Sequence, residues 1–509
     1  MSEIHADQSQ MPPYGISINR SGPSSLLSQT IEALRSAIHS GRLAGGSKLP
    51  PSRELAKELG LSRSVVVAAY EQLEAEGYLE GRVGSGTFVL GSAAAAFPGD
   101  DPRDRDSSRK RALAGDRARP EPPKGRPFYR DRRDGDVIDF VGASACSALE
   151  LFPREEWSRC LSLAARGGSA RGPAERASSG YGFGDAAGDR ALRRAIADYL
   201  FRMKGMSCGE DELIITSGSS QAALLLGALL RDRYSAIQVE DPTYPPLRAT
   251  LKRMGLRLRP LAVDDAGLLP ESVDGSLPLL ATPAHHFPTG ALLPAERREA
   301  IAARLRAGDS IAIEDDYDGE LRLRGLPIRP LRAIAPDRVA LMGSFSKSMY
   351  PGLRLGYLAV PERLVERLLG IKFALALWAG GLEQAALARF IDEGRLDRRI
   401  RRIKRDCADK RALVEELAAG LPGGGASVVG EGCGMHCALA FPGDPPASFR
   451  RSETVRAGFV ASPLSSFSIL PDSGREEAIL IGYGALSAER IREGFARMAS
   501  YIASALRSD

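Results

Sequence analysis

The stretch GSFSKSMYPGLRLGY, residues 343–357, decides how the larger part of this chain folds and what chemistry it can carry. It follows an apolar run that predicts a buried strand, so its lysine comes just after a strand end. Lys347 can form a Schiff base with an aldehyde once a lowered pKa leaves its amine neutral. Ser344 and Ser346 can hydrogen-bond phosphate oxygens, and Arg354 can neutralise a phosphate through two parallel hydrogen bonds. The stretch suits a phosphate-bearing aldehyde, although Ser-x-Ser-Lys alone is also common in solvated turns.

Four other segments place polar or aromatic side chains where predicted strands end. TSGSSQ (216–221) lies between a strand and an apolar helix, where backbone N–H groups and hydroxyls make an anion site. DPTY (241–244) follows the next strand, and Tyr244 can stack on a planar ring. EDDY (314–317) ends a further strand, and a carboxylate there can keep a pyridine nitrogen protonated. A Pro- and Gly-rich loop, residues 282–290, follows another strand.

Each of these residues also has an ordinary structural explanation. Tyr244 could be a core side chain, while Asp315 and Ser219 could simply cap helices. Because all five segments fall at strand ends, however, together they favour a single site for a phosphorylated pyridine aldehyde.

The sequence around this site has the pattern of a large α/β unit. Apolar β-type runs at 212–216, 236–240, 310–314 and 339–342 alternate with helical stretches. Strands separated by helices predict a parallel sheet that is covered on both faces. We assign residues 137–509 to this unit.

The segment 91–136 differs in amino-acid composition from the regions on either side of it. Between residues 98 and 136 there are twelve Lys or Arg and nine Asp or Glu, with almost no large apolar residue before Phe128. Such a segment cannot bury enough surface to offset its ordering entropy. It predicts a flexible charged linker, with an insertion folded onto a domain as the alternative.

The overall composition excludes several classes of protein. With 509 residues, 43% hydrophobic and 26% charged, the chain can build two to four globular domains and is not disordered throughout. No apolar run is long enough to span a bilayer, and the N-terminal residues do not predict a secretory signal. Six cysteines are too few for a disulfide framework, and a net charge of +5 permits an anionic partner.

Residues 14–90 predict a small domain of three helices followed by two short strands. Apolar residues recur at helical spacing over 27–38, which indicates an amphipathic first helix. Ser52 is a plausible N-cap of a second helix, which Gly60 ends in the left-handed conformation. Ser62 can cap a third helix that continues to about residue 76.

Two short helices joined by a tight glycine turn are the helix-turn-helix layout, whose second helix enters the DNA major groove. Ser62, Arg63 and Ser64 begin that helix, and an arginine there can donate two hydrogen bonds to a guanine edge. RVGSGTFV (82–89) predicts a two-stranded wing whose glycines allow close approach to phosphates. A small helical packing domain is the alternative, because residues 13–90 carry eight basic and seven acidic side chains.

The segments PSRELA (51–56), LGLSR (59–63), LEAEG (73–77) and GSGTFV (84–89) closely resemble the winged helix-turn-helix of the GntR family of bacterial repressors. This resemblance implies binding to a double-stranded DNA operator. It assigns DNA contacts to Arg53, Arg63 and Arg82, with supporting contacts from Ser52, Ser62, Ser64, Gly84 and Thr87.

The chain as a whole resembles the MocR subfamily of GntR regulators over residues 14–90 and 137–500. That subfamily joins a winged helix-turn-helix through a variable linker to a fold-type I aminotransferase-like domain. YGFGD (181–185) and GMH (434–436) also fit its pattern. The fold class expected is therefore α/β for the large domain, which the resemblance makes a pyridoxal 5'-phosphate binding effector domain.

The resemblance also assigns the individual contacts to the cofactor. Lys347 becomes the catalytic Schiff-base lysine, Asp315 the partner of the pyridine nitrogen, and Tyr317 a contact to the ring oxygen. The remaining contacts are a stacking aromatic, Tyr244, and a phosphate cradle made of Ser219, Ser220, Ser344, Ser346 and Arg354.

Three positions depart from the aminotransferase pattern. Phe287 replaces the Asn that usually precedes Pro-Thr-Gly, and His286 replaces the Gln usual in the subfamily. Leu480 stands where an Arg normally grips the α-carboxylate of an amino acid. This departure puts ordinary transamination in doubt, unless Arg248 or the region of Arg475 supplies a substitute cation.

We therefore expect a cytoplasmic, nucleoid-associated transcriptional regulator, homodimeric and without net turnover. It would sense pyridoxal phosphate itself, or an amine or amino acid that condenses with it. The alternatives are a working aminotransferase with an accessory DNA-binding domain and a structural repressor without a cofactor. No metal is expected, because Cys433, His436 and Cys437 offer only three clustered ligands.

Overall fold

A computed structural model describes residues 16, 18–20, 24–82, 84–90, 137–167, 184–323, 329–430, 432–443, 445–470 and 478–507. It divides into two compact units, Met1–Lys124 and Gly125–Asp509, which are treated separately below. The linker predicted at 91–136 lies outside the described residues, as do Arg475 and residues 181–183 of the YGFGD segment. No helix in the described ranges is both long and apolar enough to cross a membrane.

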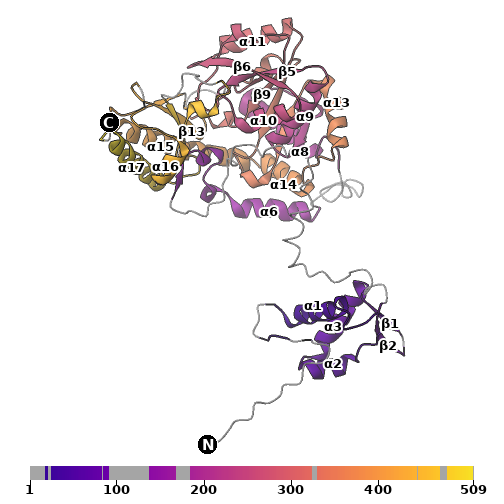
Figure 1. The fold of residues 1–509 in the computed structure, drawn as a ribbon. Helices are drawn as coiled ribbons and strands as arrows, with labels where there is room; N and C mark the ends of the chain where they lie inside the picture. The colour runs from indigo at the N-terminus through magenta and orange to yellow at the C-terminus, as the bar shows by residue number, and fades with distance from the viewer. Residues whose placement is uncertain are drawn as a thin grey trace, which may run out of the picture. The chain divides into compact units, whose positions relative to one another are not determined.

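The N-terminal unit consists of three helices and a two-stranded antiparallel wing (Figure 1). Its elements are α1 (Leu26–His39), α2 (Ser52–Leu59), α3 (Arg63–Ala75), β1 (Leu79–Arg82) and β2 (Gly86–Val89). They pack around a shared core in which Leu34, Leu55, Val66 and Leu73 are fully buried. The predicted helix pair and wing are both present.

The helix ends in this unit follow the sequence signals only in part. Gly60 ends α2 with a φ of 62°, as predicted. Ser52, expected as the N-cap of α2, is instead its first residue, because Pro51 holds the extended cap position. Ser62 is the N-cap of α3, but its hydroxyl lies 3.0 Å from that of Ser64 and caps no backbone N–H group.

An eight-stranded sheet forms the centre of the large unit. Its order is β4-β11-β10-β9-β8-β5-β6-β7. The strands are β4 (Leu213–Thr216), β5 (Ala236–Asp241), β6 (Arg257–Asp264), β7 (Gly267–Leu268), β8 (Leu279–Ala281), β9 (Ala312–Asp316), β10 (Val339–Ser344) and β11 (Gly356–Ala359).

The expected all-parallel sheet is mixed instead. Strands β10, β9, β8, β5 and β6 pair in parallel, as the sequence predicts, whereas β11 is antiparallel to both of its neighbours and β7 to β6. A parallel return needs a crossover of a dozen or more residues. The connections at 345–355 and 265–266 are shorter than that, so β11 and β7 run backwards.

Helices cover both faces of the sheet, which confirms the two-face prediction. One face buries Ile214, Met342 and Leu358 in a cluster with residues of α9 (Ser219–Arg231), α10 (Pro245–Arg253) and α13 (Glu362–Ala374). The opposite face buries Ile215 and Leu341 with residues of other helices. These are α6 (Arg154–Ala165), α8 (Arg190–Lys204) and α14 (Gly381–Asp392), while α11 (Ala295–Ala307) and α12 (Leu331–Ile334) pack near β8 and β9.

A smaller lobe completes the large unit with a four-stranded antiparallel sheet of order β12-β13-β16-β15. Its strands are β12 (Ser427–Val429), β13 (His436–Ala440), β15 (Ser462–Pro463) and β16 (Ala478–Gly482), and β14 (Phe459–Val460) pairs with β3 (Ile138–Asp139). Its helices are α15 (Arg395–Ala419), α16 (Arg451–Arg456) and α17 (Ala488–Ala505).

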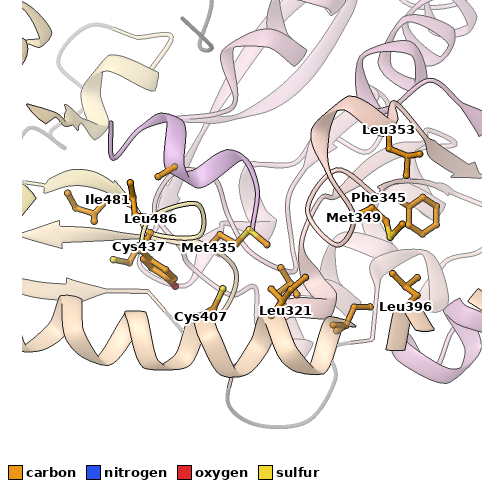
Figure 2. Close-up of a cluster of buried hydrophobic side chains, with 14 of the residues drawn as sticks. Leu321, Phe345, Met349, Leu353, Leu396, Cys407, Met435, Cys437, Ile481 and Leu486 are labelled. Carbon is orange, nitrogen blue, oxygen red and sulfur yellow. The ribbon is translucent and has the colours of Figure 1, made fainter. Parts of the chain in front are cut away.

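One hydrophobic cluster runs from the large sheet into this lobe (Figure 2). Phe345 and Met349, from the connection after β10, share it with Cys407 on α15 and Ile481 on β16. The connection that carries Lys347 is therefore anchored by the common core of both lobes.

Candidate functional site

Lys347 lies in the short connection between β10 and β11. Its ammonium group donates a hydrogen bond to the carbonyl oxygen of Ser144, in the 3-10 helix Gly142–Ala145. Its nitrogen is 5.7 Å from the centre of the Tyr317 ring. Burial lowers the pKa of Lys347, although the carboxylates of Asp318 and Asp315 act in the opposite direction. The lysine is therefore shifted toward the neutral amine that nucleophilic attack on an aldehyde requires.

Asp315 is a buried carboxylate with an unused acceptor atom. It lies on β9, is 5% exposed, and its Oδ1 has no hydrogen-bond partner. Burial, followed by repulsion from Asp316 and Asp318, raises the pKa of Asp315 to about 8. Buried polar atoms are almost always satisfied in native proteins. The unpaired oxygen of Asp315 can therefore accept a hydrogen bond from an N–H donor of a ligand, such as a protonated pyridine nitrogen.

The predicted phosphate cradle assembles at the N-terminus of α9. Ser219 and Ser220 are the first two residues of that helix, where unpaired backbone N–H groups favour an anion. Gly218 precedes them with a φ of 88°, and a Cβ atom there would lie 3.1 Å from Nη2 of Arg354. The same guanidinium nitrogen donates to the carbonyl oxygen of Ser217 at 3.0 Å. A side chain at this position would crowd the arginine, and the positive φ independently favours glycine.

Strand register brings the serines after β10 toward the same place. Ser344 pairs with Gly356, which in turn pairs with Thr216 at the end of β4. The backbone N–H of Ser346 donates to Oγ of Ser344 at 3.2 Å. Neighbouring strands are about 4.8 Å apart, so Ser344 lies roughly 10 Å from Thr216. Gly356 of β11 lies between these two strand ends, so the ends of β4 and β10 open on the same edge of the sheet.

The two predicted aromatic contacts lie against other rings. Tyr244, at the start of α10, meets Phe287 edge to face with ring centres 5.3 Å apart. Tyr317 donates its phenolic hydrogen bond to the carbonyl oxygen of His285 at 2.8 Å. Tyr317 thus lies beside Lys347, and Tyr244 lies on the rim of the apolar cluster that contains Phe287.

A buried histidine–aspartate pair was missed by the sequence reasoning. Nδ1 of His285 is 3.0 Å from both carboxylate oxygens of Asp318, and its ring is 4.4 Å from that of His436. A Cβ atom at Gly434 would collide with Asp318, so this pair also requires its glycine. The only signal was the position of His285 in the loop at 282–290, to which no role was given.

A second missed group surrounds Glu240 on β5. Its carboxylate accepts hydrogen bonds from the N–H and the hydroxyl of Thr282, both at 2.7 Å, and lies 3.7 Å from Nε2 of His286. Burial raises the pKa of Glu240 to about 7, against the effect of these hydrogen bonds. Sequence reasoning noted His286 only as a departure from the subfamily.

The sequence groups Cys433 with His436 and Cys437, whereas the structure places its sulfur near His285 and Asp318. Its sulfur and the ligand atoms of His285 and Asp318 all lie within 4.8 Å of one another, and all three residues are buried. His285 and Asp318 already share a hydrogen bond. We therefore assign this group a structural role.

In the N-terminal unit, five predicted DNA contacts lie where α2 and α3 begin. Nε of Arg63 is 3.5 Å from the hydroxyl of Ser52, and Ser62 and Ser64 share a hydrogen bond. Arg53 is exposed on the first turn of α2. These side chains form one exposed polar surface.

The wing carries the remaining predicted contacts. The guanidinium of Arg82 lies 4.8 Å from the Phe88 ring centre and pairs with Glu80 at 2.9 Å. Gly84 is exposed with a φ of 76°, and Thr87 is half-buried on β2. Lys48, which the sequence reasoning overlooked, pairs its backbone with Phe88 and adds a second cation beside this ring.

Two family descriptions match the chain. Residues 26–89 match the bacterial regulatory proteins of the gntR family. Residues 161–492 match the aminotransferase class I and II family.

Relatives of similar length combine both parts. The pyridoxine biosynthesis transcriptional regulator PdxR of Corynebacterium glutamicum is 31% identical over 478 residues, covering 94% of this chain and 96% of that protein. The probable rhizopine catabolism regulatory protein MocR of Rhizobium meliloti is 30% identical, covering 92% and 91%. The kynurenine aminotransferase structure from Pyrococcus horikoshii superposes with a TM-score of 0.64 at 22% identity, covering 72% of this chain and 91% of that one. This last likeness shows the fold.

The burial of Asp315 predicts how the stability of the cofactor-free protein depends on pH. Its carboxyl has a pKa of about 8 when folded, against about 3.9 when unfolded. Its contribution to stability therefore falls as pH rises from about 4 to about 8, because the unfolded chain releases the proton first. Asp315→Asn cannot ionise, so its unfolding free energy relative to wild type should increase between pH 5 and pH 8.

Urea unfolding at the two pH values measures this difference. Asp211→Asn, at a side chain that is 92% exposed, is the matched control and should show no such trend. Equal differences at both pH values for Asp315→Asn would show that this carboxylate is ordinarily ionised in the folded protein.

Proposed function

The chain belongs to the MocR subfamily of GntR-family transcriptional regulators, and from that membership we propose that Lys347 of its large unit binds pyridoxal 5'-phosphate to control DNA binding. The observation that carries this proposal is the proximity of a half-buried lysine to a buried carboxylate. Lys347 has a lowered pKa, and the nearby carboxylate of Asp315 keeps an acceptor oxygen without a partner.

The residues present fit this cofactor at each of its polar ends. When bound, pyridoxal phosphate supplies an aldehyde that condenses with amines and a ring that withdraws electrons. Asp315 would hold the ring nitrogen protonated, and Lys347 would present its amine to the aldehyde. The phosphate would be held by Arg354 and the N-terminus of α9, with Ser219, Ser220, Ser344 and Ser346 as hydroxyl donors.

Tyr317 and Tyr244 have separate tasks in this proposal. The hydroxyl of Tyr317 would contact the ring oxygen, and its present hydrogen bond to His285 already fixes its orientation. Tyr244 would stack on the ring, supported from the side by Phe287. The His285–Asp318 pair and Glu240 would position the loop beneath the ring.

A regulator is favoured over a working aminotransferase. Both relatives described above are named as regulators, and they match this chain over nearly its whole length. Leu480 also leaves the expected carboxylate-binding position apolar. The regulator would act at an operator in the cytoplasm, at the nucleoid. Occupancy of the cofactor site would bias the conformation of the large unit and thus the DNA-binding domain, which is a coupling free energy between two sites.

A homodimer is the assembly that we propose. Phe373 and Leu375, at the end of α13, are 68% and 50% exposed, and such clustered apolar side chains often mark an interface. The double variant Phe373→Asp, Leu375→Asp should shift the chain from dimer to monomer in light scattering. Val455→Asp, at an exposed apolar side chain of the smaller lobe, should leave the mass unchanged. A monomeric wild type would contradict the proposal.

The covalent role of Lys347 is tested by trapping. Wild-type protein incubated with pyridoxal phosphate should develop a visible absorbance band, and borohydride should fix one cofactor to the peptide that contains Lys347. Lys347→Ala should lose both signals, because Lys347 is the lysine that acts on Asp315 among the described residues. Lys252→Ala, at an exposed lysine, should keep them. Labelling of the Lys347→Ala protein to the wild-type extent would refute the assignment.

DNA recognition is tested at the start of α3. Arg63→Ala should weaken binding by about 1–3 kcal/mol, because one bidentate contact to a base edge is lost. The probe is double-stranded DNA selected by the wild-type protein from a random-sequence library, and affinity is measured by gel-shift titration. Arg367→Ala removes one exposed positive charge from the large unit and should have no effect. Unchanged affinity for Arg63→Ala would show that a surface other than the start of α3 contacts the bases.

A further inference from the structure

We propose that the ligand sensed beside the cofactor is an apolar primary amine that carries no carboxylate. This inference rests on the proposed function and specifies the chemical class that the same site accepts. Three observations support it: an apolar wall, the sign of the nearby charges, and a hydrogen-bonded segment that covers the wall.

The apolar wall is a cluster of buried side chains that faces away from the main core of the smaller lobe. Its members come from both lobes, and Tyr244 and Tyr317 pack on its rim. Leu480 is fully buried in it, whereas its neighbours Ile479 and Ile481 on β16 belong to the main core. The buried members are Val141, Phe287, Ala438, Val460, Leu464, Phe467 and Leu480.

Two contacts place this wall beside Lys347. The ring of Tyr317, on the rim of the wall, lies 5.7 Å from the lysine nitrogen. Val141 directly precedes the 3-10 helix whose Ser144 carbonyl accepts the hydrogen bond from Lys347. A group attached to an amine that reaches this position would therefore meet apolar side chains.

The charges that act on Lys347 are mostly negative. Asp318, Asp315 and Glu320 all raise its pKa, so their carboxylates are close enough to be felt. A ligand carboxylate would be repelled by Asp318 while it lost its hydration, and an unpaired buried charge is costly. A cationic amine, by contrast, is attracted to this site.

Among the described residues, which leave out 471–477, two guanidinium groups near the wall bind protein acceptors. Arg248 donates to the carbonyl oxygens of Phe467 and Ser468 at 2.7 and 3.1 Å. Arg411 donates to Glu415 and to the carbonyl oxygen of Gly430. One guanidinium nitrogen of Arg248, the cation that the sequence allowed as a substitute, is therefore engaged by the protein backbone.

A short segment, residues 464–470, covers the wall from the side of the smaller lobe. We call it the strap. The carboxylate of Asp241 accepts hydrogen bonds from the N–H groups of Ile469 and Leu470 at 2.6 and 3.1 Å, and Arg248 holds the strap carbonyls. Leu464 and Phe467 of the strap belong to the wall itself. The strap thus adds buried apolar side chains to the wall, and a wall of low polarity strengthens the discrimination against charge.

Three matched small molecules test the inference on the full chain loaded with pyridoxal phosphate and freed of excess cofactor. They are 3-methylbutylamine, leucine, which adds one carboxylate to it, and ethanolamine, which replaces its apolar part. The readouts are the change in the cofactor absorbance band and the change in affinity for the selected DNA. We expect 3-methylbutylamine to reach half saturation at a concentration at least about tenfold below the other two.

Variants at Leu480 assign the preference to the wall. Leu480→Met conserves volume and should keep the order of the three ligands. Leu480→Arg should favour leucine over 3-methylbutylamine if it folds and loads with cofactor, and the comparison of ligands on wild-type protein decides the question if it does not.

Leucine binding as tightly as 3-methylbutylamine to wild-type protein would overturn the inference, and so would equal binding of ethanolamine or no response to any of the three. These results leave the proposed function standing as long as the cofactor band and the Lys347 label are present. Loss of the band in wild-type protein would instead remove the proposed function, and this inference with it.

Discussion

The short return between β10 and β11 is the constraint on which the candidate site depends. Eleven residues cannot make a parallel crossover, so β11 turns back and inserts antiparallel between β10 and β4. That insertion aligns the strand ends and brings Arg354 against Gly218 at the start of α9. Phe345 and Met349 anchor the same connection in the core shared by both lobes. Lys347 is thus held at a fixed place by packing on both sides of it.

The sequence was sufficient to predict the winged helix-turn-helix, the alternating α/β unit and the strand ends that carry the site. These features depend on local signals, such as Gly60 after α2 and the hydroxyl-rich segment before α9, which hold regardless of the tertiary context. The antiparallel course of β11 was missed because the periodicity of a strand does not encode its direction. The length of the connection before a strand does indicate its direction, and the eleven residues 345–355 are too short for a parallel crossover.

Contacts between distant segments account for what the sequence did not predict in the site. Asp318 and His285 follow the neighbouring strands β9 and β8, but Gly434 reaches them only after the smaller lobe packs against the large one, and no spacing in the sequence indicates this. Ser52 was misplaced as a cap because Pro51, which lacks an N–H group, can also take the extended cap conformation. The role of Arg248 likewise became visible only when its partners, the strap carbonyls, were located.

The hydrogen bonds that hold the strap to Asp241 and Arg248 are made through its main chain. Asp241 binds two of its backbone N–H groups and Arg248 binds two of its backbone carbonyls, so the clamp does not depend on which side chains the strap carries. Substitutions at Leu464 or Phe467 would therefore change the apolar wall while the hydrogen bonds from Asp241 and Arg248 stayed in place. In a fold built this way, the side chains of the wall can vary one at a time without a compensating change in the backbone contacts that hold the segment.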